Sequence, residues 1–150
     1  MTNIYFDFED GNGPVPAHQH SNGGGWVADT AKVDATARVD PDAQVYGNAK
    51  VYGDAWVSSN ARVYDDAIVY DDAWVYGYAR VYGDAIVSGD AIVSGKATVS
   101  SNARVYGDAE VSSNARVNGD ETEKELIGID VKDRIFINGK WYVEEVEDDE

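Results

Sequence analysis

The hexapeptide Ala49-Lys50-Val51-Tyr52-Gly53-Asp54 is the unit from which most of this 150-residue chain is built. Valine recurs at every sixth residue from Val27 to Val117, and from Val33 onward an alanine stands two residues before each valine. A repeat this regular decides the fold, because every unit has to adopt the same local structure. A period of six matches neither the 3.6-residue turn of an α-helix nor a heptad, so the sequence excludes a helical rod.

Each unit fits a short strand followed by a corner. The alanine and valine point inward, the residues between them point outward, and two residues then turn the chain. The corners read Gly-Asn, Gly-Asp, Ser-Asn, Asp-Asp and Gly-Lys, residue types that tolerate left-handed backbone angles. Because the inward pattern restarts after each corner, successive strands cannot form hairpins, and three hexads close one triangular coil of eighteen residues. We therefore predict an all-β, single-stranded parallel β-helix of about five coils, roughly 25 Å long.

Composition and charge exclude several classes of function. The chain carries 28 acidic and 12 basic residues, a formal charge of −16, which argues against nucleic acid or an anionic membrane surface as a partner. It has no cysteine, so disulfides, thiolate metal sites and thiol catalysis are excluded. No apolar run approaches the roughly 18 residues of a membrane span, and the first eight residues are too acidic for a signal peptide. We expect no membrane insertion and a location in the cytoplasm or in a virion.

Units such as Val-Tyr-Gly-Asn-Ala, Val-Tyr-Gly-Asp-Ala and Val-Ser-Gly-Asp-Ala resemble the hexapeptide repeat of left-handed parallel β-helix proteins. The resemblance covers residues 26–120. The lead-in Gly23-Gly24-Gly25-Trp26-Val27 and the uninterrupted units after it are similar to bacterial and phage proteins labelled hexapeptide transferases, a label inherited from acyltransferases of the same fold. The resemblance implies left-handed coiling, where general connection rules favour the right hand, and it implies a homotrimer and a phage virion or bacterial accessory setting. It does not fix the chemistry, because a fold hosts many functions.

The sequence divides into three segments. Residues 1–25 hold a short alternating strand, Ile4-Tyr5-Phe6-Asp7-Phe8, and a Gly/Pro-rich connector, and we expect Trp26 to fold over the first coil. Residues 26–120 form the β-helix. Residues 121–150 form a C-terminal cap with an acidic tail, in which the pair Asn138-Gly139 between apolar runs indicates a hairpin within residues 126–146.

Outward residues eighteen positions apart should stack in columns, and some of these columns are apolar. Exposed isoleucine and tryptophan ladders usually mark a contact surface, although β-formers can also simply decorate a sheet. We predict a self-association surface, most simply of a homotrimer, and other virion or surface proteins are further candidate partners. Its residues are Trp56, Trp74, Ile68, Ile86 and Ile92. We interpret the column of Tyr46, Tyr64 and Tyr82 as surface decoration.

A second column is acidic. Asp54, Asp72, Asp90 and Asp108 recur at one corner, eighteen residues apart. Clustered carboxylates suit a hard cation, so this edge is a candidate cation site. The competing interpretation is that aspartate at a corner satisfies turn backbone groups and faces water.

The chain has two histidines, His18 and His20, and both precede the repeat. Trimeric acyltransferases of this fold, as the resemblance implies, use a histidine as general base, but here the hexads contain neither a histidine nor an inserted loop. His20 is the catalytic candidate, although His18 could also serve, and Asp7, Glu9 and Asp10 are carboxylates that could orient a catalytic histidine. The pair also resembles the His-x-His element of iron-binding phage spike tips, which predicts an axial metal ion in a trimer. The third interpretation is a polar loop before the first coil.

The leading hypothesis from sequence is a non-enzymatic structural or interaction rod, homotrimeric, without a cofactor. One alternative is an acyl-CoA-dependent acyltransferase of the hexapeptide-repeat type. A second alternative is a metal-tipped trimeric spike element held by His18 and His20.

Overall fold

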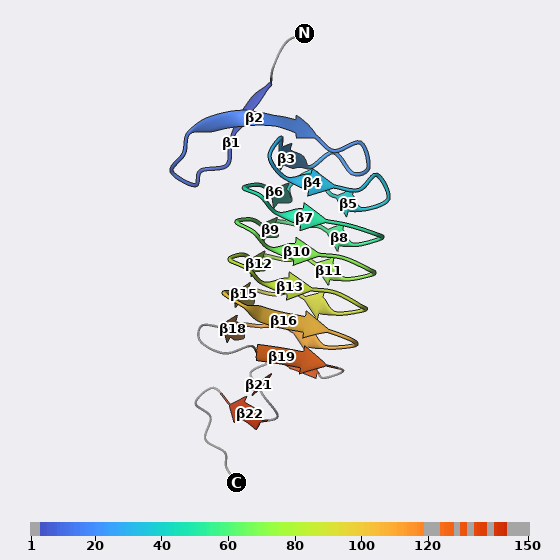
Figure 1. The fold of residues 1–150 in the computed structure, drawn as a ribbon, viewed down its shortest axis with the longest axis vertical. Helices are drawn as coiled ribbons and strands as arrows, with labels where there is room; N and C mark the ends of the chain where they lie inside the picture. The colour runs from blue at the N-terminus through green and yellow to red at the C-terminus, as the bar shows by residue number, and fades with distance from the viewer. Residues whose placement is uncertain (1–3, 119–123, 128–129, 132–133, 138–139, 144–150) are drawn as a thin grey trace.

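The computed structural model describes residues 4–118, 124–127, 130–131, 134–137 and 140–143. Within these residues every regular element is a strand, and there is no helix long and apolar enough to cross a membrane. The strands wind into a solenoid of about five coils, stacked along the long axis of the molecule (Figure 1). The predicted all-β, parallel solenoid is confirmed.

Three parallel sheets form the three faces of the solenoid. The first face contains β3 (Trp26–Ala28), β6 (Gln44–Val45), β9 (Arg62–Val63), β12 (Arg80–Val81), β15 (Thr98–Ser100) and β18 (Arg116–Asn118). The second face contains β4 (Lys32–Val33), β7 (Lys50–Val51), β10 (Ile68–Val69), β13 (Ile86–Val87), β16 (Ala103–Tyr106) and β19 (Lys124–Ile127). The third face contains β5 (Arg38–Val39), β8 (Trp56–Val57), β11 (Trp74–Val75), β14 (Ile92–Val93), β17 (Glu110–Val111) and β20 (Asp130–Val131).

The register between coils is eighteen residues. Ile68 lies opposite Ile86, and Val69 lies opposite Val87. Backbone hydrogen bonds join each coil to the next, as in the bond from the Tyr52 N–H to the Val69 carbonyl at 2.9 Å. Each short strand is therefore stable only as a member of a ladder, because its backbone groups find their partners on other coils.

The interior contains valine and alanine. Every hexad valine from Val39 to Val117 has 0% of its surface exposed, and the hexad alanines from Ala37 onward are equally enclosed. These side chains form one continuous core along the solenoid. A triangular coil with two-residue corners leaves little room inside, which explains why small residues fill it and why the chain has a single leucine.

From Gly47 to Ser113, the two-residue corners turn the chain because the first corner residue adopts a left-handed φ, 65° at Gly53 and 62° at Asp71. The N–H of the second corner residue then donates to the next coil, as from Asp54 to the Asp71 carbonyl at 2.9 Å. The corners therefore stack with the same spacing as the strands.

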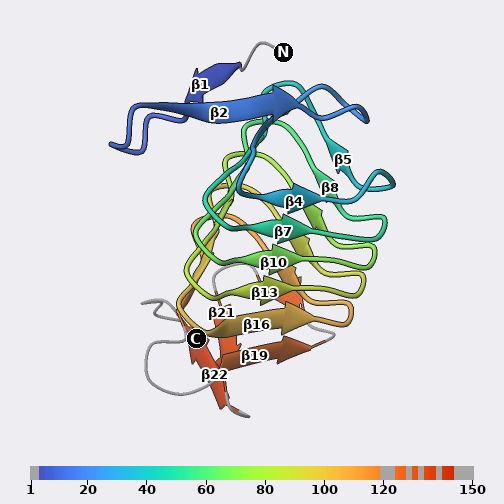
Figure 2. The same ribbon diagram turned by 45° about the horizontal axis from the view of Figure 1, so that its top comes forward.

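An N-terminal cap covers the first coil. β1 (Tyr5–Asp7) pairs antiparallel with β2 (Pro14–Gln19), and β2 pairs antiparallel with β3, so both strands extend the first face beyond the coils (Figure 2). The loop after β2 covers the edge strand β5, because the Gly25 N–H donates to the Val39 carbonyl at 2.8 Å. The strand expected near residues 4–8 is present, whereas residues 14–19, expected as connector, form a strand. Pairing of β2 satisfies an edge that would otherwise be open.

At the other end the parallel ladders run further than the hexad pattern predicts. β19 pairs in parallel with β16, with Leu126 opposite Val105, and β20 pairs in parallel with β17, with Val131 opposite Val111. Only β21 (Arg134–Ile137) and β22 (Lys140–Val143) form the expected antiparallel hairpin. Residues 126–127 and 130–131 thus pair in parallel, unlike the antiparallel unit expected there, because extending the two ladders pairs the last coil's backbone groups. The Asn138-Gly139 turn and the acidic tail lie outside the described residues.

Candidate functional site

The predicted tryptophan column is present on the third face. The rings of Trp56 and Trp74 stack with centroids 4.8 Å apart and planes at 7°, and Ile92 lies opposite Trp74 on the next coil. Each of these three side chains is half-buried. Together they form the Trp strip, an apolar band along β8, β11 and β14.

Hydrogen bonds at the indole nitrogens fix the orientation of the two rings. The Trp56 Nε1–H donates to Asp40 Oδ2 at 2.9 Å, and the Trp74 Nε1–H donates to the Ser58 hydroxyl at 3.0 Å. The Arg38 guanidinium carbon lies 5.4 Å from the centre of the Trp56 ring, within cation–π distance. The Trp strip is therefore a preorganised surface, since its polar atoms have partners within the same chain.

Ile68 and Ile86 are adjacent on the second face, with Lys50 and Arg104 at either end of their column. The structure thus brings the five predicted interface residues together in two groups rather than one. The groups occupy neighbouring faces, and the acidic corner separates them.

At that corner Asp54, Asp72, Asp90 and Asp108 are all exposed. The neighbouring Asp71 has a structural role, because its Oδ2 accepts the Gly89 N–H of the next coil at 3.2 Å. Within the ranges that the structure describes, no three His, Cys, Asp or Glu side chains gather closely enough to hold a metal ion.

His18 lies on β2 and contacts a carboxylate. Its Nδ1 is 2.7 Å from Asp29 Oδ1, and both side chains are about half exposed. The Asp29 N–H donates to the Pro16 carbonyl at 2.9 Å, which holds this carboxylate beside β2. The expected partners were Asp7, Glu9 and Asp10; Asp29 was missed, because the pairing of β2 with β3 has no repeat signature in the sequence.

His20 has a different environment. Only 7% of its surface is exposed, and its Nε2–H donates to the Ala37 carbonyl at 2.8 Å. The Asn22 side-chain amide donates to the same carbonyl at 3.1 Å. His20 therefore anchors the cap loop on the first coil. Of the two histidines, His18 lies within β2, whereas His20 lies just beyond its end at Gln19.

A pocket of about 290 Å³ lies beneath the cap. Phe8, Val15 and Tyr46 supply its apolar walls, and Asp10 and Asp29 add two carboxylates. This acidic lining is unfavourable for an anionic ligand such as coenzyme A.

Two open pockets lie on the first face. One, of about 360 Å³, includes Trp26 and Arg62, together with Gln44, whose Oε1 is buried without a hydrogen-bond partner. The other, of about 520 Å³, is lined by Tyr78, Arg80, Lys96 and Thr98.

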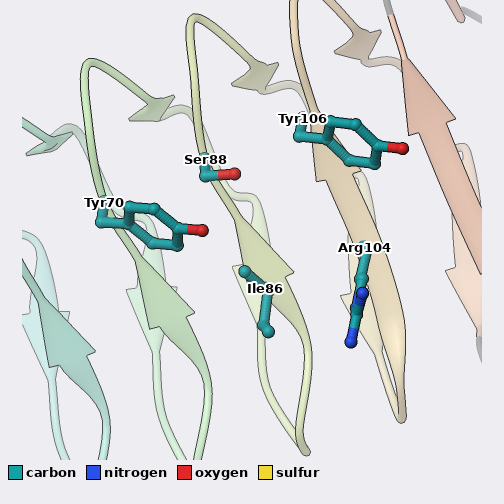
Figure 3. Close-up of a pocket in the computed structure, with 5 residues that line it drawn as sticks. All are labelled: Tyr70, Ile86, Ser88, Arg104 and Tyr106. Atoms are coloured by element: carbon teal, nitrogen blue, oxygen red, sulfur yellow. The ribbon is translucent and has the colours of Figure 1, made fainter.

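On the second face a fourth pocket of about 360 Å³ is lined by Tyr70, Ile86, Ser88, Arg104 and Tyr106 (Figure 3). Ser88 stands eighteen residues after Tyr70 and eighteen residues before Tyr106, so at this position a serine interrupts a column of tyrosines. The sequence signal for this pocket is the interruption of a tyrosine repeat.

The tyrosine column on the first face is a packed aromatic stack. Tyr46 and Tyr64 have ring centroids 4.9 Å apart, and Tyr64 and Tyr82 have theirs 5.0 Å apart. Phe8 from the cap adds a further ring, 4.7 Å from Tyr46, and Trp26 on β3 of the same sheet stacks on Phe6 with ring centroids 4.5 Å apart. Burial raises the pKa of the Tyr46 hydroxyl above 10.0, against the lowering effect of Arg62, and burial and Tyr46 together raise the pKa of Tyr64.

Comparison with known proteins supports the solenoid. The family model of the YdcK beta solenoid repeat matches three times, at residues 43–59, 61–77 and 79–95. The starts of these matches are eighteen residues apart, which is the length of one coil in the structure. No curated protein and no solved structure matches the chain. In its repeat region the chain is a β-solenoid, similar to the YdcK beta solenoid repeat.

Proposed function

We propose that this protein is a non-enzymatic structural and interaction module, a stiff β-solenoid rod that associates with copies of itself, most simply as a homotrimer. The observation that carries the proposal is the Trp strip, a preorganised apolar band along three consecutive coils of the third face. In keeping with the resemblance of the repeat, we infer a left-handed coil and a phage virion or bacterial accessory assembly as its setting.

The composition of the coils supports a mechanical role. Their interior is alanine and valine throughout, and the corners have only two residues, so no loop projects from the hexads to enclose a substrate. The hexads also contain no histidine. What they present to solvent is a fixed pattern of side chains at constant spacing, which suits a spacer or a docking surface.

The apolar character of the Trp strip supports self-association as the mechanism. Stacked half-buried rings leave their outer faces in water, and covering them removes apolar surface from solvent. Ile68 and Ile86 offer a second apolar patch on the neighbouring face. Tryptophan is also among the residues that contribute most to interface energetics.

The test is the molar mass in solution, measured by size-exclusion chromatography with light scattering. We expect the unmodified protein to have three times the chain mass and Trp74→Arg to elute as a monomer, because the substitution places a charge in the strip. Thr98→Arg, on the outer side of β15 in the first face, is the matched control and should remain trimeric. An unchanged mass for Trp74→Arg, with a native circular dichroism spectrum, would refute the proposed surface.

One observation favours a second candidate function, an acyl-CoA-dependent acyltransferase. The His18–Asp29 pair, at 2.7 Å, has the arrangement of a general base oriented by a carboxylate. This function requires coenzyme A to bind. A rise in melting temperature with millimolar acetyl-CoA, reduced in His18→Ala, would support it, and the lack of any shift would exclude it.

A further inference from the structure

The third face has two edges of different charge, and the Trp strip lies between them. Four exposed aspartates on successive coils occupy the corner where the chain enters this face from the second face. They are Asp54, Asp72, Asp90 and Asp108. On the same coils, the corner where the chain leaves for the first face has no carboxylate. Its second positions are Asn60, Tyr78, Lys96 and Asn114.

A cationic hollow lies beside this second edge. It is the open pocket of about 520 Å³ that is lined by Tyr78, Arg80, Lys96 and Thr98. Arg80 and Lys96 are exposed, and among the described residues no carboxylate lies within salt-bridge distance of either. In a chain with a net charge of −16, an acidic partner is needed to neutralise this pair of cations.

The acidic corner and the cationic hollow also match in height along the solenoid. One coil of eighteen residues rises about 4.8 Å, so Arg80, eight residues after Asp72, lies about 2 Å further along the axis. Lys96, six residues after Asp90, lies about 1.6 Å further along. Copies related by a rotation axis parallel to the solenoid are not shifted along it, so opposite charges can pair only at similar heights. Both pairs meet this condition within the reach of a side chain.

On the basis of the homotrimer proposed above, we propose that the acidic corner of each copy docks into the cationic hollow of the next, with Asp72 opposite Arg80 and Asp90 opposite Lys96. Each copy then presents a different surface to each neighbour, and three such contacts close a ring. Because the third face connects the two contacts, the three Trp strips face the threefold axis and cover one another.

In this arrangement the charge pairs lie at the rim of an apolar contact. Rim charges contribute to the orientation and register of the partners more than to affinity. A neighbour turned end for end would bring two acidic corners together, so the two edges also select against an antiparallel assembly.

The pairing is tested by charge reversal, with molar mass in solution from light scattering as the readout. One double variant reverses the acidic corner, Asp72→Arg with Asp90→Lys, and another reverses the hollow, Arg80→Asp with Lys96→Asp. Each should have the mass of one chain at a concentration where the unmodified protein has three times that mass, because like charges then meet at every contact. The quadruple variant restores opposite charges and should return to three times the chain mass.

Asp66→Arg with Asp84→Lys is the matched control. Both aspartates are exposed second corner residues like Asp72 and Asp90, but they lie where the first face meets the second, and the variant should remain trimeric. Thr98→Arg adds a cation to the hollow opposite an acidic corner and should remain trimeric as well. Folded reversal variants that keep the threefold mass, a quadruple variant that stays monomeric, or an equal loss in the control would each overturn the pairing.

Cross-linking gives a second readout, because the chain has no cysteine of its own. In the variant Asp90→Cys, Lys96→Cys the two thiols lie at opposite edges of one third face, and each should form a disulfide with the other position on a neighbour. Oxidation should then give covalent trimers on a denaturing gel, and either single substitution should give none. Dimers from a single substitution would reveal a contact between identical edges and refute the ring, as would a double variant without cross-links.

The charge pairing and the self-association fail in different ways. If the Trp strip alone joins the copies, Trp74→Arg has the mass of one chain while both reversal variants remain trimeric. If the unmodified protein itself has the mass of one chain, self-association is refuted and the pairing with it.

Discussion

At the scale of single residues, the position within the coil decides what a side chain does. Tyr46, directly after a strand valine, is 5% exposed and lies in an aromatic stack, whereas Tyr78, at a corner, is 62% exposed. Residue type alone does not separate the two. The hexad register does, because it fixes whether a residue points inward, stacks in a column or projects from a corner.

Burial of the tyrosine stack predicts a dependence of stability on alkaline pH. The pKa values of Tyr46 and Tyr64 are raised in the folded protein, so between pH 10 and those values the folded state holds protons that the unfolded state releases. The stabilisation by the two neutral hydroxyls is complete below pH 10 and is lost as the pH rises through the folded-state values.

We therefore expect the melting temperature to fall above pH 10. In a Tyr46→Phe, Tyr64→Phe double variant the melting temperature should fall less over the same pH range. Absorbance at 295 nm should show tyrosine ionisation above pH 10 that is lost in the double variant. Tyr78→Phe is the control and should behave like the unmodified protein. A double variant with an unchanged alkaline slope would show that these hydroxyls are not responsible.

The residues of the candidate sites were predictable only where the repeat governs them. The Trp strip and the aspartate corner follow directly from eighteen-residue spacing. Asp29 and Phe8 do not, because their partners His18 and Tyr46 are brought to them by the antiparallel cap. That pairing depends on tertiary packing, which leaves no periodic pattern in the sequence.

At the scale of elements, the β1–β2 hairpin is the feature that closes the solenoid. It extends the first face, and Phe8 attaches it to the aromatic stack. The valine period predicts every hexad strand but not β2, whose two prolines argue against a strand. Both prolines are tolerated because they lie in the part of β2 that pairs with β1 alone, whereas the pairing with β3 uses Ala17, His18 and Gln19.

Phe8→Ala should loosen this cap. The ring is 1% exposed, and the loss of such a buried aromatic side chain costs about 3 kcal/mol. We expect a lower melting temperature and faster hydrogen exchange in β3, with the exchange of β10 unchanged. Tyr5→Ala, on the neighbouring strand β1 but 56% exposed, is the control and should change the free energy of unfolding by less than about 0.5 kcal/mol. Equal effects of the two variants would mean that Phe8 does not attach the cap.

At the scale of the whole molecule, charge repulsion opposes folding. The net charge is −16, and one corner carries Asp54, Asp72, Asp90 and Asp108 on successive coils. Salt screens such repulsion, with a screening length of about 10 Å at 0.1 M. We expect the melting temperature to rise by a few degrees between 20 and 500 mM NaCl.

The same measurement in MgCl₂ at matched ionic strength tests the predicted cation site at this corner. A bound divalent ion would raise the melting temperature beyond the effect of NaCl, and an Asp72→Asn, Asp90→Asn double variant would lose the excess. Equal effects of the two salts on the melting temperature would show that charge screening, without a bound divalent ion, accounts for the stabilisation. A melting temperature that falls with NaCl would contradict the role of repulsion itself.

The eighteen-residue register also determines which face of the solenoid each outward side chain occupies. Removing one coil of eighteen residues shortens the rod and leaves every later side chain on its own face. Removing a single hexad preserves the strands, the corners and the valine interior, yet it rotates everything beyond the cut by a third of a turn. The Trp strip and the acidic corner would then each be divided between different sides of the solenoid. The interior therefore tolerates the insertion or deletion of any multiple of six residues. The outer surface restricts such changes in length to whole coils of eighteen residues.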